Sequence, residues 1–400
     1  MGNTVHLLDF SDLIKDIEQS YNEVVEWRRH LHQHPELSFQ EYETSKFIAE
    51  KLEQFGITEI QRNVGGTGLV AKIEGAQPGK TIAFRADFDA LPIQDLKTVP
   101  YASKNKGVSH ACGHDGHTAA LLGFAKNIVK YKHLLKGNIL FIFQHAEEQP
   151  PGGAKDMIAE HILDDVDYVF GAHLDSSLDV GKVAVGSGYK MAAVDHFKIH
   201  LKGLGGHGAR PHEAIDALVG GAELVGSLQK IVSRNIDPLQ AAVVTVGQFH
   251  SGSAFNVIAE TAFIEGTVRT YDETIRHFVK ERIEQITKGI SLAHNLQYEI
   301  EYLLGYPALY NDEQQTEKVK QALKDGFGVE AVVELQPSMG AEDFAYFLLE
   351  KPGTYFKVGS KNERTETQFP HHHGRFDIDE NVLVNIQKAF AYITYAYLIS

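Results

Sequence analysis

The sequence predicts an α/β protein in which a smaller α+β unit is inserted into a larger one. Helical and strand patterns alternate along the chain, and no internal repeat is visible. The region 81–143 has the order strand, helix, strand, which is the βαβ unit of a parallel sheet. The 400 residues also exceed what one hydrophobic core usually organises, so we expect two or three globular units.

The first elements belong to the larger unit. Residues 11–55 have the pattern of an amphipathic helix, interrupted at His34-Pro35 because proline disfavours a helical conformation in the residue before it. Three strands and one helix are expected next: strands at 81–84, 138–143 and 166–172, and a helix at 115–132. The third strand is expected to carry His173 at its carboxyl end.

The pattern changes at about residue 186. The elements expected after it are a strand at 195–201, a helix at 213–234, strands at 241–249 and 261–269, a helix at 273–295 and a strand at 298–303. This order describes a small open-faced sandwich. Beyond about residue 305 helices and strands alternate again, so the larger unit is expected to resume there.

Composition narrows the class of protein. The net charge of −15, without a basic tract, disfavours nucleic acid and anionic membranes as partners. Apolar runs such as 139–143 are strand-sized, far short of the roughly 18 residues of a membrane helix, so a soluble protein is expected. The single cysteine, Cys112, forbids an intrachain disulfide, and the first residues lack the build of a signal peptide. Both observations favour the reducing cytoplasm.

The densest cluster of metal-competent side chains lies at 109–117, Ser-His-Ala-Cys-Gly-His-Asp-Gly-His. Cys112 and His114 are two residues apart just before the expected helix, so a thiolate and an imidazole can meet one metal ion there. Asp115 is expected to cap that helix. The alternative is a helix start whose histidines only satisfy backbone groups, and the density of the cluster argues against it.

Adjacent carboxylates follow the apolar strand that ends near residue 144. Active sites of open α/β sheets lie at the carboxyl ends of strands, where Glu147 and Glu148 are expected. Neighbouring residues of an extended chain point to opposite sides, so one carboxylate is expected to bind metal and the other to move protons. The alternative is a solvated turn ahead of Pro150-Pro151.

Three further positions fit a site at the strand ends. His173 follows one strand, and Asp87 and Asp89 follow another, two residues apart. An internal run of three histidines, 371–373, precedes structured sequence. A lone strand-end histidine is more often structural, and a solvated loop is the alternative for the triple run.

One motif points to a different chemistry. Residues 203–208 match the G-x-G-x-x-G pattern of dinucleotide sites. However, residues 209–212 separate the last glycine from the expected helix, whereas that pattern needs the glycine packed in the helix itself. A dinucleotide site is therefore disfavoured, and serine catalysis is too, because no G-x-S-x-G motif occurs.

Taken together, these residues resemble the M20 family of metallopeptidases and amidohydrolases, in particular its branch that acts on N-acyl amino acids, hippurate and auxin conjugates. The matching stretches are 28–38, 85–93, 110–117, 146–148 and 340–344. The resemblance implies a catalytic domain with a mixed, largely parallel sheet flanked by helices, interrupted by a smaller lid domain that often mediates dimerisation. It thus implies a catalytic domain of residues 1–186 and 305–400, a lid of residues 187–304, and a homodimer or larger homo-oligomer.

The resemblance also implies two divalent metal ions per subunit, drawn from Zn, Mn, Co and Ni. The implied ligands are Cys112, His114, Glu148, His173 and His372. His372 is chosen over His371 and His373 by its offset from Arg375-Phe376, so these alternatives stay open. Many relatives carry an H-x-D pattern where this chain has Asp87-Phe88-Asp89, so whether Asp87 or Asp89 contacts metal also stays open. We expect Asp89 to orient a ligand.

The activity implied by the resemblance is hydrolysis of the amide bond of a small N-acyl amino acid. Glu147 would be the general acid and base, and His207 would stabilise the oxyanion. Asn256 and Arg269 would bind the substrate carboxylate, for which the arginine fork is suited. The alternatives are a dipeptidase, a carboxypeptidase or an N-acetyldiaminopimelate deacetylase of the same family, and, outside enzymes, a metal-binding protein without turnover.

Overall fold

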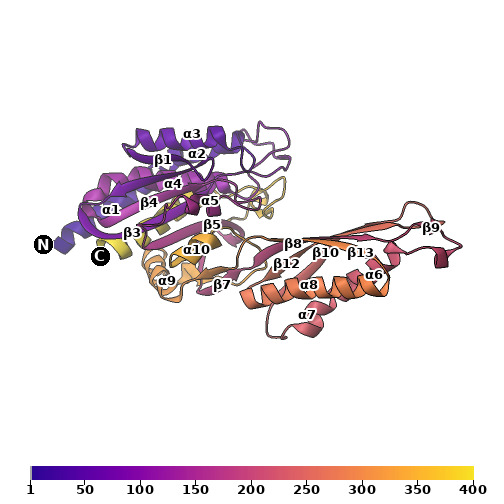
Figure 1. Ribbon diagram of the computed structural model, residues 1–400. Helices are drawn as coiled ribbons and strands as arrows, with labels where there is room; N and C mark the ends of the chain where they lie inside the picture. Colours follow the sequence, from indigo (N-terminus) through magenta and orange to yellow (C-terminus); the bar gives the residue numbers. More distant parts are fainter. Residues whose placement is uncertain (1) are drawn as a thin grey trace. The chain divides into compact units, whose positions relative to one another are not determined.

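The computed structural model describes residues 2–400, and their contacts divide the chain into two compact units (Figure 1). Unit 1 contains the chain up to Lys190, together with Tyr310–Gln336 and Asp343–Ser400. Unit 2 contains Met191–Leu309 and Pro337–Glu342. The predicted domain boundaries, at 187 and 304, and the predicted lid role stay predictions.

The centre of unit 1 is a mixed sheet, which within residues 2–400 has eight strands. In spatial order these are β1 (Glu59–Val64), β2 (Gly68–Glu74), β4 (Lys136–Gln144), β3 (Gln77–Asp87), β5 (Tyr168–Asp179), β16 (Gly353–Lys361), β6 (Val183–Val185) and β15 (Val332–Glu334). β3 runs parallel to both β4 and β5, and β5 runs parallel to β16. The predicted fold class, with its largely parallel sheet, is confirmed.

The sheet of unit 1 is combined with eight α-helices among the described residues. They are α1 (Gly2–Gln19), α2 (Tyr21–Gln33), α3 (Tyr42–Gln54), α4 (His114–Ile128), α5 (Ala154–Ala159), α9 (Glu313–Phe327), α10 (Ala345–Glu350) and α11 (Asn381–Thr394). Shorter helical turns are Val129–Leu134, Val329–Ala331, Thr365–Gln368 and the terminal Tyr395–Ile399. The expected break at Pro35 separates α2 from α3. The β3–α4–β4 order is the predicted βαβ unit.

The β1–β2 hairpin is not among the elements expected from the sequence. Its strands pair antiparallel, and β2 also pairs antiparallel with β4. Most of β1 is exposed and polar, so its sequence resembles that of a loop. The turn uses Gly65 and Gly66 with φ of 65° and 137°, a conformation that glycine adopts without steric cost.

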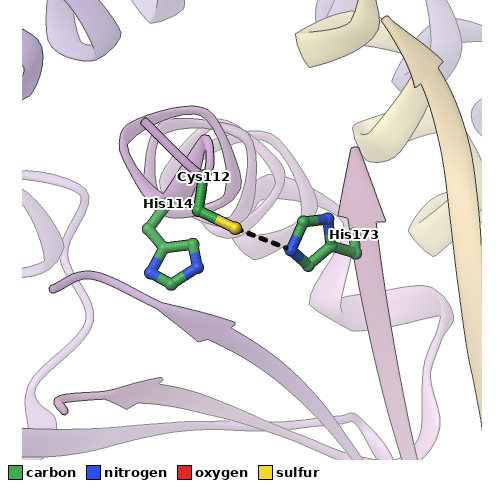
Figure 2. A group of neighbouring side chains, drawn as sticks. All are labelled: Cys112, His114 and His173. Atoms are coloured by element: carbon green, nitrogen blue, oxygen red, sulfur yellow. Dashed lines mark hydrogen bonds between the residues drawn. The ribbon is translucent and has the colours of Figure 1, made fainter. Parts of the chain in front are cut away.

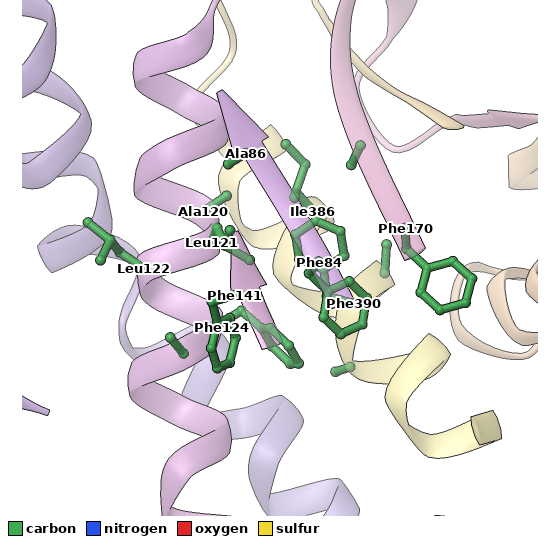
Figure 3. Packing of buried hydrophobic residues seen from close by; sticks show 14 of the residues in the cluster. Phe84, Ala86, Ala120, Leu121, Leu122, Phe124, Phe141, Phe170, Ile386 and Phe390 are labelled. Carbon is green, nitrogen blue, oxygen red and sulfur yellow. The ribbon is translucent and has the colours of Figure 1, made fainter. Parts of the chain in front are cut away.

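The core of unit 1 fixes α4 against the sheet (Figure 3). The ring of Phe84 on β3 lies 5.4 Å from that of Phe124 on α4 and 4.6 Å from that of Phe390 on α11. Phe141 on β4 completes the group, at 6.1 Å from Phe124. Because α4 is buried along almost its whole length, its first turn is held rigidly beside the carboxyl end of β3.

The end of the chain contains an unusually apolar helical segment. Among the described residues, Asn381–Ile399 is the one helix that has the length and hydropathy of a membrane span. However, 61% of that segment is buried inside the protein. It therefore packs as a core helix does, and the core helices of globular proteins can have the same length and hydropathy as a membrane span.

Unit 2 is built on an antiparallel sheet, four-stranded within the described residues, with α6 and α8 along one face (Figure 1). Its elements are β8 (Ala193–Lys202), β9 (Gly206–His207), α6 (Ala217–Leu228), α7 (Lys230–Asn235), β10 (Ala242–Ser251), β11 (Val257–Ile258), β12 (Thr261–Thr270), α8 (Glu273–Ala293) and β13 (Gln297–Leu304); a short turn spans Pro211–Glu213. Two short strands, β7 (Gly188–Met191) and β14 (Leu309–Asn311), form a separate pair, and most of their residues belong to unit 1. The expected open-faced sandwich is present.

The first helix of unit 2 begins later than expected. The sequence predicts a helix from residue 213, but α6 starts at Ala217, because Asp216 caps it by accepting from the backbone N–H groups of Leu218 and Val219. The glycine motif at 203–208 therefore ends nine residues before the helix. This spacing agrees with the rejection of a dinucleotide site.

Candidate active site

The start of α4 and strand β5 bring Cys112, His114 and His173 together (Figure 2). The Cys112 sulfur lies 3.6 Å from His173 Nε2. Gly113 makes this approach possible, since it has φ of 95° and a Cβ there would lie 2.6 Å from Leu174 Cδ1. Burial, together with the charges of Glu148 and Glu147, raises the pKa of the Cys112 thiol well above its usual range. The thiol would therefore release its proton readily only when a cation binds and stabilises the thiolate.

His114 presents one ring nitrogen to the site. Its Nδ1 lies 3.0 Å from Asp89 Oδ1, and its Nε2 is buried without a hydrogen-bond partner among the described residues. Burial lowers the pKa of His114, but the charges of Asp87 and Asp89 outweigh burial and raise it to about 10. A buried nitrogen in such anionic surroundings, beside sulfur and carboxylate donors, fits a divalent cation.

His173 has the protonation state that metal binding requires. Its Nδ1 lies 2.5 Å from the carbonyl oxygen of Leu174, which assigns the proton to Nδ1 and leaves Nε2 facing Cys112. Burial and the neighbouring His117 and His371 lower the pKa of His173 well below its usual range. The imidazole is therefore neutral near pH 7.

The predicted place of His173 at the end of its strand is wrong. β5 continues to Asp179, because β16 pairs with it beyond His173. Its pairing with β3 ends earlier, at Arg85 with Gly171. His173 thus lies two residues beyond the end of this pairing, where its side chain faces Cys112 at the start of α4 (Figure 2).

Glu147 and Glu148 converge, although they are expected to point to opposite sides. Glu147 Oε2 lies 3.9 Å and Glu148 Oε1 3.8 Å from His114 Nε2. The expectation is wrong because β4 ends at Gln144, so the alternation of an extended strand does not reach the two glutamates. Both carboxylates therefore flank the same imidazole.

Of the three consecutive histidines, His372 is the one that joins this group. Its Nε2 lies 3.3 Å from Glu148 Oε1, and its backbone N–H donates to the carbonyl of Ala111 at 2.8 Å. The hydrogen bond with Glu148 raises the pKa of His372. By contrast, His371 Nε2 accepts from the backbone of Ser176, and His373 Nδ1 accepts from that of Arg375.

Asp87 and Asp89 are held by different partners. Asp87 accepts from Arg85 Nη1 at 2.6 Å and lies 2.6 Å from His117 Nδ1. Since His117 Nε2 accepts from the Leu174 N–H, both its nitrogens are used within the protein. Asp89 contacts the His114 ring and accepts from the backbone of Glu148 at 3.0 Å, so it touches two predicted ligands. This arrangement suits the orienting role expected of Asp89.

The three remaining predicted residues lie in unit 2. His207 on β9 pairs with Val257, and the Gly208 N–H donates to the carbonyl of Asn256 at 2.8 Å, so His207 and Asn256 are neighbours. Both side chains are exposed. Arg269 lies on β12 and donates to the carbonyl of Met339 at 3.4 Å. Their predicted roles stay predictions.

A buried network of charges lies near the site, and the sequence does not predict it. Asp115 was expected to cap α4, but it lies within the first turn of that helix and accepts from Arg28 Nε at 2.8 Å and contacts His32 Nδ1 at 2.7 Å. Arg28 also donates to Asp377 at 2.9 Å. The charges of these partners raise the pKa of Arg28 despite its complete burial. Apart from its place in the 28–38 stretch, nothing in the sequence distinguishes Arg28 from a solvated helix residue.

Comparison with known proteins agrees with this geometry. The model of the peptidase family M20/M25/M40 matches residues 83–395. The chain belongs to this family. It is 48% identical over 389 residues to the putative amidohydrolase YhaA of Bacillus subtilis, covering 97% of this chain and 98% of that one. The predicted family and the predicted enzyme class, a hydrolase of amide bonds, are confirmed.

Two further relatives of this M20-family chain are informative. The N-acyl-L-amino acid amidohydrolase of Geobacillus stearothermophilus is 50% identical over 298 residues, covering 74% of this chain and 80% of that one. The crystal structure of YXEP from Bacillus subtilis, described as a dinuclear metal binding peptidase of the M20 family, superposes with a TM-score of 0.80. It is 34% identical and covers 94% of this chain and 98% of that one.

Proposed function

We propose that this protein hydrolyses the amide bond of N-acyl amino acids, using two divalent cations and Glu147 as general acid and base. The observation that carries the proposal is the convergence of sulfur, nitrogen and carboxylate donors around the buried Nε2 of His114. The proposed ligands are those that the family resemblance implies: Cys112, His114, Glu148, His173 and His372.

The mixed donor set bears on the metal. Thiolate and imidazole favour zinc and cobalt, and the glutamate also suits manganese. Two bound cations would lower the pKa of a water molecule and polarise the scissile carbonyl. The dinuclear description of the related structure supports a count of two.

We assign the proton transfer to Glu147. Its side chain is 10% exposed, and its Oε2 lies 3.9 Å from Nε2 of the predicted ligand His114. In the proposed reaction Glu147 takes a proton from the attacking water and passes it to the amine nitrogen as the C–N bond breaks. The products are a carboxylic acid and an amino acid.

The residues of unit 2 complete the proposal. We assign His207 to the oxyanion, and Asn256 and Arg269 to the carboxylate of the amino acid. Burial lowers the pKa of Arg269, but the guanidinium stays charged at any physiological pH. We also propose a homodimer or larger homo-oligomer, and a reducing cytoplasmic compartment, since a ligating Cys112 must stay a thiolate.

Activity against a defined panel tests the proposed function. N-acetyl, N-benzoyl and indole-acetyl amino acids are compared with dipeptides, in the presence of Mn, Co, Ni or Zn. We expect hydrolysis of N-acyl amino acids, and a loss of about 10²- to 10⁴-fold in kcat for Glu147→Gln, because the amide cannot accept the proton. Preferred cleavage of dipeptides, or near-normal turnover by Glu147→Gln, would contradict the proposal.

A further inference from the structure

The segment 38–41 contacts residues that flank the candidate active site. The Ser38 hydroxyl donates to Asp89 Oδ2 at 2.7 Å. Glu41, three residues later, is completely buried although it is a glutamate. Buried carboxylates are rare unless they are fully hydrogen-bonded, so the partners of Glu41 indicate what it does.

Both oxygens of Glu41 accept hydrogen bonds. Oε1 accepts from the backbone N–H of Ala146 at 2.9 Å and from that of Phe39 at 3.0 Å. Oε2 accepts from the Thr67 hydroxyl at 2.7 Å. The bond to Ala146 joins the beginning of α3 to the end of β4, more than 100 residues away in the chain.

Ala146 has a conformation that only a few non-glycine residues adopt. Its φ is 49°, in the left-handed region, which costs roughly 1 kcal/mol or more and persists only where the surroundings enforce it. Two contacts do so, since the Ala146 N–H is bound by Glu41 and its carbonyl accepts from the Gly153 N–H at 3.1 Å. This turn directs the next two residues, Glu147 and Glu148, to the same side.

We propose that Glu41 is a positioning residue: its carboxylate holds the Ala146 peptide in the left-handed turn and thereby aims Glu147 and Glu148 at the metal site. The inference rests on the proposed function for the roles of the two glutamates. The position of the Glu41 oxygens, and not their charge, holds the turn, because each of the three partners requires only a hydrogen-bond acceptor at that position.

Two substitutions separate geometry from charge. Glu41→Gln keeps a carbonyl oxygen at Oε1, and its amide can donate to the Thr67 hydroxyl, which accepts as well as it donates. Glu41→Asp keeps the charge but withdraws both oxygens by about 1.5 Å, one carbon–carbon bond. The proposal therefore predicts that the Gln variant works and the Asp variant fails.

The experiment measures metal affinity by calorimetric titration with Zn²⁺, together with kcat and KM. We expect Glu41→Asp to lose about 10- to 100-fold in metal affinity and in kcat, with a smaller change in KM, and Glu41→Gln to stay within a few-fold of wild type. A functional Asp variant, or a Gln variant as impaired as the Asp variant, would overturn the proposal. If the Asp variant does not fold, loss of metal affinity in the Gln variant alone overturns it.

Glu36→Asp is the matched control. Glu36 is in the same segment, and its carboxylate accepts from the backbone of Thr44 and Glu43 at the start of α3, away from Ala146. We expect this variant to lose stability but to keep kcat and metal affinity. A catalytic loss equal to that of Glu41→Asp would assign the effect to α3 and overturn the proposal.

A readout without metal or substrate distinguishes failure of this inference from failure of the proposed function. The Ala146 amide should exchange with solvent roughly tenfold faster in Glu41→Asp than in wild type or Glu41→Gln, because its hydrogen bond is lost. Wild-type protein that hydrolyses no N-acyl amino acid refutes the proposed function only. Equal exchange in all three proteins refutes the role of Glu41.

Discussion

Asp89 sets the orientation of two predicted ligands. Its Oδ1 lies 3.0 Å from His114 Nδ1, and its Oδ2 accepts from the backbone N–H of Glu148. Because the aspartate occupies Nδ1, only Nε2 of His114 is available to a cation, and that nitrogen faces the glutamates. One carboxylate outside the predicted ligand set thus orients an imidazole and a carboxylate at once.

Glu41 also predicts a pH dependence of stability. Burial, assisted by the charge of Asp89, raises its pKa from 4.5 to about 7. A raised pKa means that the folded state favours the protonated carboxyl group. The contribution of Glu41 to the free energy of unfolding is therefore largest below pH 4.5 and is lost as the pH rises through 7. Metal-free wild type should therefore lose up to about 3 kcal/mol relative to Glu41→Gln between pH 4.5 and 8.

Urea unfolding of both metal-free proteins across this pH range measures the difference between their free energies of unfolding. The contributions of the other titrating groups cancel in this difference. The Gln variant has no carboxyl group at this position, so its advantage should grow with pH. A difference that stays constant, or that shrinks as the pH rises, would contradict the raised pKa.

Residue types were predictable from the sequence, but their directions were not. The strand-end pattern and the family resemblance indicate Glu147 and Glu148 without any three-dimensional geometry. Their convergence depends on the positive φ of Ala146, and an alanine carries no sign of that conformation. Glu41 could not be identified either, because a glutamate before a helix is usually solvated.

Arg28 joins three elements around the site. From α2 it reaches Asp115 in the first turn of α4, and Asp377 and Glu380 just before α11. The arginine is completely buried, so these charges are screened little by water. It therefore holds the start of α4, next to Cys112 and His114, against the segment that follows His372.

Removal of this arginine should be costly. Arg28→Met leaves the buried carboxylates of Asp115 and Asp377 without their cation, which we expect to lower the free energy of unfolding by about 3–5 kcal/mol. Arg29→Met is the control, because Arg29 is 46% exposed, pairs with Glu380 and lies over the Tyr101 ring, so a loss of about 1 kcal/mol is expected. Urea unfolding measures both, and equal losses would contradict the account.

Elements with a clear periodicity were predictable. The strands and helices of unit 2 follow the expected order because their apolar residues alternate or recur at helical spacing. The β1–β2 hairpin escaped prediction because β1 is mostly exposed and polar. The extension of β5 past His173 depends on pairing with β16, more than 180 residues later in the chain, and no local pattern contains that information.

At the scale of the whole molecule, the site is assembled from distant parts of the sequence. His372 meets Glu148 although more than 220 residues separate them, and the chain passes through unit 2 in between. Periodicity predicts the elements but not such a meeting. The family resemblance does predict that Glu148 and His372 belong to one site, and the family model matches residues 83–395, a range that contains both.

The metal content of the folded protein tests the central claim most directly. Elemental analysis after equilibration with Zn²⁺ should give two ions per chain for wild type and for Glu147→Gln, and fewer than two for Cys112→Ala. That result would identify Cys112 as a ligand and separate metal binding from the proton transfer of Glu147. Unchanged stoichiometry in Cys112→Ala, or wild-type protein without bound metal, would contradict the account.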